Sequence, residues 1–283
     1  MSNLKTVHVN DITNAVAGLC IKACNQLPSA VCALLDQAIK DETYAPARET
    51  LRLISHNATV AKEMNMPMCQ DTGMTVVYVF LGQDVHIEGG LLTDAINAGV
   101  SKGYIEGYLR KSMVGDPLRR KNTGDNTPAI IHIKLVAGNS LSITVAPKGI
   151  GSENMSRLCM LTPASGIEGV KRFIIETVKI AGANPCPPMM LGVGIGGSFE
   201  QVAAIAKEAL VLPREEIHPD PFYAELEATL LEEINSLGIG PQGFGGRTTA
   251  LSIRIKAAPT HIAGLPVAVN VGCHATRHAS ITL

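Results

Sequence analysis

The sequence predicts an α/β fold in which mixed sheets are flanked by helices, with a helical segment at the N-terminus. Apolar residues recur at helical spacing up to about residue 66, and short strand-like runs then alternate with amphipathic segments. The hydrophobic fraction of 46% against 17% charged residues is typical of a well-packed globular protein. We expect a single domain over residues 1–283, with a helical cap over about 1–66 and an α/β body over about 67–283.

Helices dominate the first part of the chain. Amphipathic helices are predicted over residues 11–26, 29–41 and 46–65. Asn10 or Asp11 can cap the first helix, and Pro46 fits the first turn of the third, where its missing N–H costs nothing.

Strands and helices alternate through the body. Strands are expected near residues 74–82, 189–195, 248–257 and 266–272, and helices near 90–110, 165–182, 199–211 and 220–237. The stretch AIIHIKLV, AGN, SLSITVAP around 129–147 predicts a hairpin, because a short turn-forming segment joins two strand-like runs. The Pro/Gly-dense segment LGIGPQGFGGR, 237–247, predicts a long structured loop.

Charge and the N-terminal sequence indicate where the protein works. Lys and Arg number 24 and Asp and Glu 25, so the net charge of −1 provides no field for binding nucleic acid or an anionic membrane. The segment MSNLKTVHVNDITNAV has neither the pattern of a signal peptide nor that of a transit peptide, and no long apolar run suggests a membrane span. We therefore predict a cytoplasmic protein that binds neither nucleic acid nor membrane.

The chain contains seven cysteines, an odd number that favours free thiols or metal ligands over a disulfide framework. Cys20, Cys24 and Cys32 lie in apolar helical patterns, where a thiol packs as a small hydrophobic group, and Cys159 is also expected in the core. A metal clip formed by Cys20 and Cys24 has no further ligand nearby.

The remaining three cysteines stand where regular structure is expected to meet a loop. Cys69 in MCQDTG precedes a strand, Cys186 in ANPCPPMM lies between prolines, and Cys273 in VNVGCHATRH follows a strand. Such positions often present functional side chains. No local Cys-x-x-Cys spacing links them, so a shared metal site is one hypothesis among several.

Polar residues around these thiols suit a site for an anionic substrate. Arg110 could clamp a carboxylate through two hydrogen bonds, and His261 could donate or accept a proton near neutral pH. The Asp71 carboxylate could orient a ligand or take a proton, and Gln70 and Lys148 are further groups that an acid/base or anion site would want. Each residue also has a purely structural interpretation, as a turn former, a helix end, a surface charge or a hydrogen-bonded loop residue.

A glycine pattern favours a different function. Gly192, Gly194 and Gly197 form G-x-G-x-x-G after a short strand, with Glu215 and Glu216 about 20 residues further on, as in nicotinamide-binding folds. The proline-rich segment NPCPP leaves little room for the preceding strand, however, and the helix is followed by LPREEIHPDPFYAEL rather than by a long apolar strand. Both features disfavour a nicotinamide-binding unit. The alternatives are close backbone approach at a compact site or tight helix packing.

Six ordered motifs together resemble the class I (iron–sulfur) fumarase and tartrate dehydratase family. They are MCQDTG, RRKNTGDNTPAIIHI, APKGIGSENMS, GANPCPPMMLGVGIGGSFE, GPQGFGGRTTAL and THIAGLPVAVNVGCHATRHA. The resemblance runs from about residue 10 to the C-terminus. It implies a [4Fe–4S] cluster with one iron free of protein ligands, held by Cys69, Cys186 and Cys273.

The resemblance also implies roles for other residues. Substrate contacts are expected from Gln70, Asp71, Arg110 and the KGIGS loop at Gly149 to Gly151. Asp71 and His261 are the expected catalytic residues, with His261 near the cluster, where it would orient the substrate or assist proton transfer. The proton-abstracting residue is expected on another polypeptide.

In this family the enzyme is one long chain or two subunits, and this chain resembles the alpha subunit of the two-subunit form. The implied partner is a beta subunit in a heterotetramer, and the implied reaction is hydration of fumarate, a small dicarboxylate of the tricarboxylic acid cycle, to (S)-malate. L(+)-tartrate dehydratase, forming oxaloacetate, is the alternative substrate assignment. An interpretation from another class is a non-enzymatic metal-binding scaffold, with zinc on the three cysteines and His261 or His274.

Overall fold

A computed structural model describes residues 4–212 and 217–283 of the chain. It divides into two compact units. Unit 1 comprises residues 1–28, 58–149 and 277–283, and unit 2 comprises 29–57 and 150–276. Residues 1–66, expected to form one helical cap, are therefore shared between the two units. The predicted α/β class, with mixed sheets and a helical N-terminal segment, is confirmed.

The predicted helices are present, as are the predicted strands. The helices are α1 Val9–Asn25, α2 Ser29–Asp41, α3 Ala45–Glu63, α4 Leu92–Glu106, α5 Ile150–Glu153, α6 Gly166–Ala181, α7 Phe199–Val211 and α8 Pro221–Asn235. The strands are β1 Lys5–His8, β2 Met74–Gly82, β3 Val85–Glu88, β4 Ile130–Val136, β5 Leu141–Lys148, β6 Arg157–Leu161, β7 Met189–Gly196, β8 Ala250–Ala258, β9 Leu265–Gly272 and β10 Ala279–Thr282. The sequence analysis missed β1, β3, β6, β10 and α5, which are too short to establish a periodic pattern.

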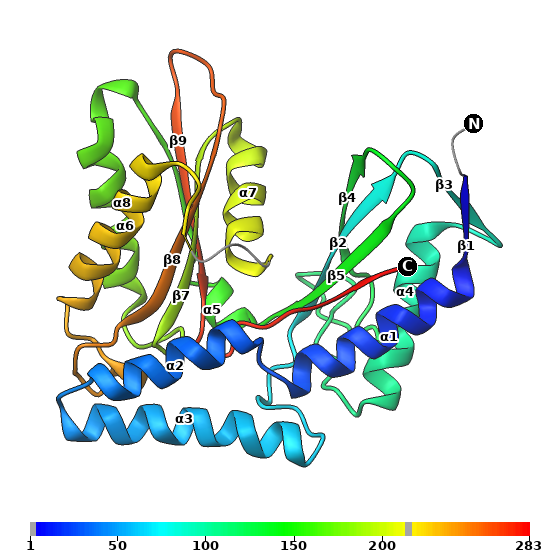
Figure 1. Cartoon of the computed structure of the whole chain (residues 1–283), viewed down its shortest axis with the longest axis horizontal. Helices are drawn as coiled ribbons and strands as arrows, with labels where there is room; N and C mark the ends of the chain where they lie inside the picture. Colours follow the sequence, from blue (N-terminus) through cyan, green and yellow to red (C-terminus); the bar gives the residue numbers. More distant parts are fainter. Residues whose placement is uncertain (1–3, 213–216) are drawn as a thin grey trace. The chain divides into compact units, whose positions relative to one another are not determined.

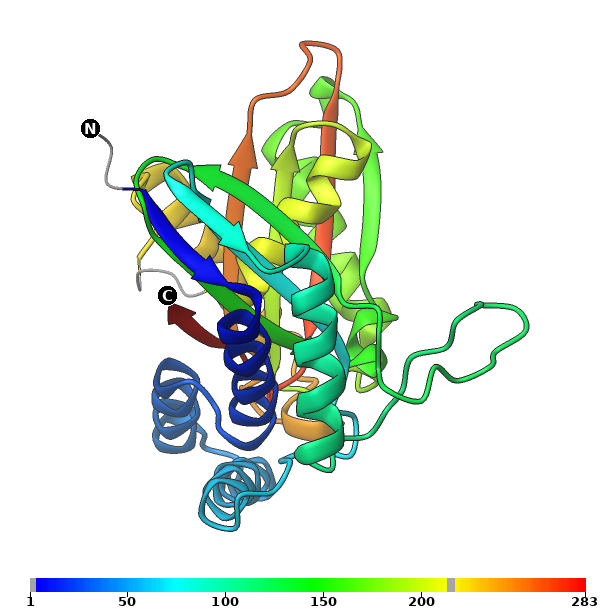
Figure 2. The ribbon, with the colours of Figure 1, turned by 90° about the vertical axis from the view of Figure 1, so that its right-hand side faces the viewer.

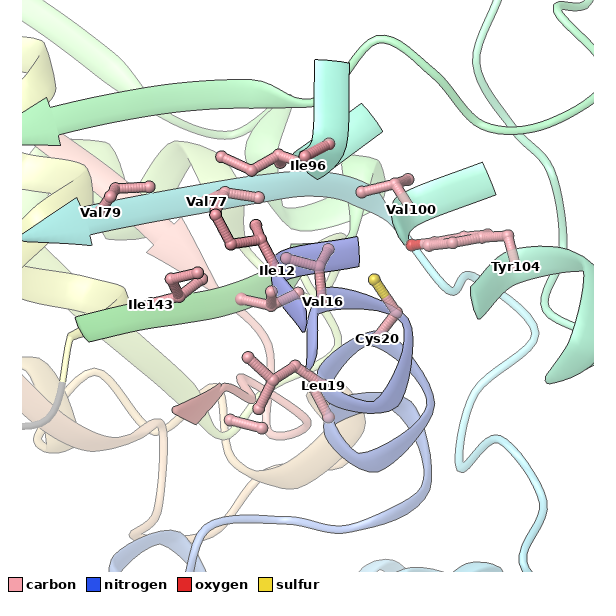
Figure 3. Packing of buried hydrophobic residues seen from close by; sticks show 14 of the residues in the cluster. Ile12, Val16, Leu19, Cys20, Val77, Val79, Ile96, Val100, Tyr104 and Ile143 are labelled. Carbon is pink, nitrogen blue, oxygen red and sulfur yellow. The ribbon is translucent and has the colours of Figure 1, made fainter. Parts of the chain in front are cut away.

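Unit 1 contains a four-stranded sheet in the order β10-β5-β2-β4, against which α1 and α4 pack, and a parallel pair of β1 with β3. Figure 3 shows side chains of α1, α4, β2 and β5 meeting in one apolar core. Ile12 and Val16 of α1, Val77 of β2 and Ile96 of α4 are completely buried there. The two helices approach closely because Gly99 faces α1, where a Cβ would lie 2.7 Å from Thr13 O.

The predicted hairpin between β4 and β5 is wrong. β2 lies between these strands, parallel to β4 and antiparallel to β5. β2 and β5 are the inner strands and are mostly buried, β4 is an edge strand, and the 137–140 connection crosses the end of β2. A Cβ at Gly82 would lie 2.4 Å from Gly138 O, so glycine permits this crossing, which pattern analysis could not foresee.

The segment between α4 and β4 forms a long loop (Figure 2). Internal hydrogen bonds brace it, since the Asp116 carboxylate accepts from the N–H groups of Leu118 and Arg119. Val114 and Asn122 form a β-bridge across the loop. Near its end, the buried Asn126 lies close to the start of β2.

Unit 2 is a sheet with helices on both faces (Figure 1). Its strand order is β6-β9-β7-β8, with β7 parallel to β8 and antiparallel to β9. Apolar residues of α6 and α8 pack with Leu191 and Val193 of β7 on one face. On the other face, Val202 and Ala206 of α7 pack against Ala268 of β9.

The glycines of the G-x-G-x-x-G pattern serve helix packing in this unit. A Cβ at Gly192 would lie 2.2 Å from Ala206 O, and one at Gly194 would lie 2.3 Å from Val202 O, both in α7. Close contact between β7 and α7 therefore accounts for these two glycines. Glu215 and Glu216, the expected acidic partners of a nucleotide ribose, lie outside the described residues.

Among the described residues, the stretch Val9–Asp41 is long enough to cross a membrane, and an 18-residue window within it has a mean hydropathy of 1.3. It consists of two helices, however, because α1 ends at Asn25 and α2 begins at Ser29. The apolar face of α1 is buried in the core of unit 1. Core packing therefore accounts for the hydropathy of α1.

Candidate active site

The loop of residues 69–73 in unit 1 presents the first group of predicted site residues. It ends where β2 begins, beside the end of β5, because Met74 pairs with Lys148. The Cys69 and Gln70 side chains are exposed, Asp71 is half-buried, and Thr72 is buried. The loop thus turns its predicted functional residues outward while its following residues enter the core.

Buried polar groups hold this loop through its main chain. The Tyr104 hydroxyl of α4 donates to Thr72 O at 2.7 Å, and Asn126 Nδ2 donates to Gly73 O at 3.2 Å. Burial raises the pKa of Tyr104 well above its usual value, so the hydroxyl stays a neutral donor. Thr72 Oγ1 donates to Arg110 O at 2.8 Å, which joins the loop to the segment carrying the exposed Arg110 side chain.

Asp71 and Gly149 lie against each other in unit 1. Asp71 Oδ1 accepts a hydrogen bond from Gly73 N at 2.9 Å, which orients the carboxylate. A Cβ at Gly149 would lie 3.3 Å from Asp71 Oδ2, so a side chain there would crowd the carboxylate. The buried Lys148 donates from Nζ to Gly149 O at 3.2 Å. The structure thus brings Asp71, Gly149 and the Arg110 main chain to the loop of Cys69.

Cys186 and Cys273 lie on neighbouring segments of unit 2. Met190 of β7 pairs with Gly272 of β9, so the start of one strand meets the end of the other. His274 Nδ1 lies 2.9 Å from Cys186 O, a hydrogen-bonding distance, and His274 N donates to the same oxygen at 3.4 Å. The segments that carry these two cysteines are therefore bonded directly to each other.

Gln242, which sequence analysis did not identify, braces the same two segments. Its main-chain N and its Nε2 both donate to Pro187 O at 2.8 Å, and Nε2 lies 3.2 Å from His274 Nδ1. Gln242 adopts a left-handed conformation with φ of 54° inside the predicted Pro/Gly-dense loop. The sequence predicted that loop. It did not predict the hydrogen bond from Gln242 to Pro187, because the two residues are 55 positions apart in the chain.

The segment of Gly151 is tied to the same end of unit 2. Glu153 of α5 accepts a hydrogen bond from Asn270 Nδ2 at 2.9 Å and forms an ion pair with Lys207. Ser156 Oγ accepts from the main-chain N of Val271 at 3.0 Å. The helix that contains Gly151 is therefore bonded to the part of β9 that leads into Cys273.

His261 and Cys273 lie at opposite ends of one strand of unit 2. The exposed His261 lies in the loop before β9, whereas Cys273 follows the other end of that strand. An eight-residue strand is roughly 26 Å long. The role expected for His261 stays a prediction, and the histidine that bonds the Cys186 segment is His274.

The exposure of four cysteines agrees with the predictions, whereas the predicted core residues Cys32 and Cys159 and the predicted ligand Cys273 are all of intermediate burial. All seven are free, with Cys20 and Cys24 buried and Cys32 and Cys159 partly buried. Cys69 and Cys186 are exposed, and Cys273 is partly exposed. Within neither unit do three or more of the described His, Cys, Asp and Glu side chains gather to hold a metal ion. The ligand set of three thiolates stays a prediction.

Comparison with known proteins identifies the family. The family model described as Fumarate hydratase (Fumerase) matches residues 13–282. A Methanocaldococcus jannaschii protein with the provisional name L(+)-tartrate dehydratase subunit alpha is 41% identical, over 95% of this chain and 96% of its own length. Proteins named L(+)-tartrate dehydratase subunit alpha from two Escherichia coli strains are 32% identical, over 96% of this chain and 91% of theirs. The chain therefore belongs to the fumarate hydratase family of hydro-lyases, as a chain of the alpha type.

Proposed function

We propose that this chain is the alpha subunit of an iron–sulfur hydro-lyase that acts on a four-carbon 2-hydroxy dicarboxylate together with a separate beta subunit. The relatives that match over nearly their whole length are named as alpha subunits, which supports the need for a partner. The geometry that carries the proposal is the direct bonding between the segments of Cys186 and Cys273, because a shared cofactor requires adjacent ligands.

Two substrates are candidates. The family description favours reversible hydration of fumarate to (S)-malate, whereas the names of the relatives favour dehydration of L(+)-tartrate to oxaloacetate. Malate and tartrate differ by one hydroxyl group, and a few hydrogen bonds are enough to distinguish one from the other.

The donor set fits an iron–sulfur cluster. Cys69 of unit 1 and Cys186 and Cys273 of unit 2 would hold it, since thiolates are the ligands that such clusters prefer and all three side chains are at least partly exposed. When bound, a [4Fe–4S] cluster with three protein ligands supplies a Lewis acid that weakens the bond to the departing hydroxyl.

The residues around the Cys69 loop would bind and orient the substrate. The exposed Arg110 guanidinium can pair with a substrate carboxylate, and the exposed Gln70 amide can donate a second hydrogen bond. The Asp71 carboxylate, which the Gly73 N–H orients, would hold or release a proton at the hydroxyl. The base that removes the carbon-bound proton would come from the beta subunit.

The test is to co-express the chain with its beta subunit under nitrogen and to assay malate, fumarate and tartrate in parallel. We expect activity on one of the two substrate pairs, loss of that activity in air, and recovery with iron and reductant. The alpha chain alone should be inactive or nearly so. Zinc without iron or sulfide in an inactive complex would instead support a metal-binding scaffold, and thermal stabilisation by NAD(H) would support the nicotinamide alternative.

A further inference from the structure

Arg277 is a buried cation of unit 1 that the mechanism above does not use. Its side chain is 3% exposed, and it stands four residues after Cys273 in the sequence CHATR. Arg277 Nη2 donates to Asp71 O at 2.6 Å. A short bond from a charged donor is stronger than one between neutral groups, so this contact fixes the peptide that follows Asp71.

The same guanidinium lies beside a second contact to the loop. Burial raises the pKa of Cys24, and Arg277 next to it lowers that pKa only in part, so the thiol stays neutral. The Cys24 thiol donates to Thr72 O at 3.8 Å, and Cys24 O accepts from Met68 N at 3.1 Å. Cys24 and Arg277 thus contact the main chain on both sides of Cys69.

Burying a guanidinium costs free energy that hydrogen bonds must offset. A core position that only needed volume would be filled more favourably by an apolar side chain of similar size. At this position the charge is directed to a carbonyl of the loop that carries Cys69, Gln70 and Asp71. The cost is explained if the arginine sets the orientation of that loop.

We propose that Arg277 is a positioning residue that fixes the Cys69 to Asp71 loop in the orientation in which Cys69 holds the cofactor and Asp71 meets the substrate. This inference rests on the proposed function. It assigns to the C-terminal segment a part in the active site that the resemblance did not include. Arg277 itself touches neither substrate nor cofactor in this proposal.

The experiment compares Arg277→Gln and Arg277→Lys with wild type in the anaerobic alpha–beta enzyme. Iron and sulfide per alpha chain, kcat, KM and the melting temperature are measured for each. We expect Arg277→Gln to lower kcat about 10- to 100-fold with a smaller change in KM, because a displacement near 1 Å has this effect at an active site. Iron retention should fall in parallel. The kcat and iron content of Arg277→Lys should be intermediate, since lysine keeps the positive charge but lacks the planar guanidinium group.

Arg254→Gln is the matched control, because Arg254 is a partly buried arginine of unit 2 next to Glu227. It should lower the melting temperature while iron content and kcat stay unchanged.

Wild-type iron content and kinetics in both Arg277 variants would overturn the inference. If Arg277→Gln does not fold, Arg277→Lys decides: reduced iron at an unchanged melting temperature supports the inference, and wild-type values refute it. A wild-type enzyme inactive on every substrate refutes the proposed function, while iron retention in the variants still tests Arg277.

Discussion

The loop of Cys69 in unit 1 and the segments of Cys186 and Cys273 in unit 2 are held in different ways. In unit 1, buried side chains reach in from three separate parts of the chain, Tyr104, Asn126 and Arg277, and each bonds a carbonyl of one short loop. In unit 2, the two segments bond each other, and a single amide side chain braces them. Unit 1 therefore relies on core side chains, and unit 2 relies on strand pairing and on hydrogen bonds between the two segments.

The largest effect on this comparison should come from displacing α7, which packs on the sheet that aligns β7 with β9. Gly192→Ala would place a Cβ 2.2 Å from Ala206 O, so α7 must shift. We expect the free energy of unfolding to fall by about 3 kcal/mol, the upper range for overpacking. Urea unfolding followed by circular dichroism measures it. Gly18→Ala, where nothing lies within 4 Å of the new Cβ, is the control and should not destabilise the protein; equal losses would contradict the packing argument.

Removing a side chain that holds the Cys69 loop should have the next largest effect. Asn126 Oδ1 accepts from Ser112 N at 2.8 Å and from Met113 N at 3.2 Å, and its Nδ2 bonds Gly73 O. Asn126→Ala leaves these groups unsatisfied, and we expect a loss of about 2 kcal/mol in the same unfolding assay. The exposed Asn122 provides the control substitution, Asn122→Ala. A loss below that of the control would mean that the loop does not depend on Asn126.

A smaller, pH-dependent effect on stability is expected from Glu42, a buried carboxylate of unit 2. Its side chain is buried and accepts hydrogen bonds from Tyr44 N, Arg247 N and Thr248 Oγ1. Burial alone would raise its pKa, but these hydrogen bonds outweigh burial and lower it. Because this pKa is lower in the folded state, the ionised carboxylate stabilises the protein at pH values above the unfolded-state pKa of about 4.3. This stability is lost as the pH falls through the folded-state pKa.

Glu42→Gln should therefore cost about 1–2 kcal/mol at pH 7, and this difference from wild type should shrink as the pH falls below about 4. Urea unfolding of both proteins across this pH range is the measurement. A difference that stays constant with pH would show that the ionised carboxylate is not the stabilising form.

The smallest effect is expected for the amide brace of unit 2. Gln242→Ala removes the side-chain bond to Pro187 O but leaves the main-chain bond to the same oxygen, so we expect a loss of about 1 kcal/mol. Chemical unfolding measures the loss, and iron retention of the reconstituted enzyme measures the effect on Cys186. A loss larger than that of Asn126→Ala would reverse the comparison between the two units.

The sequence predicted the long elements well because apolar periodicity over many residues fixes them. β2 was predicted with the residues at which it begins and ends, and α2 likewise. The predicted hairpin of β4 and β5 is wrong because β2 pairs with both strands, and a local turn signal does not report pairing with a strand from an earlier part of the chain. Arg277 and Gln242 were missed because their partners lie 206 and 55 residues away. The role expected for His261 rests on the resemblance alone and stays a prediction.

The most direct test of the central claim is the iron and sulfide content of single cysteine variants of the anaerobically reconstituted alpha–beta enzyme. Wild type and Cys159→Ser should each contain about four iron and four sulfide per alpha chain, as a [4Fe–4S] cluster requires. Cys69→Ser, Cys186→Ser and Cys273→Ser should each lose most of both. Equal iron and sulfide in all five proteins, or equal loss from Cys159→Ser, would contradict the assignment of these three cysteines as the ligands.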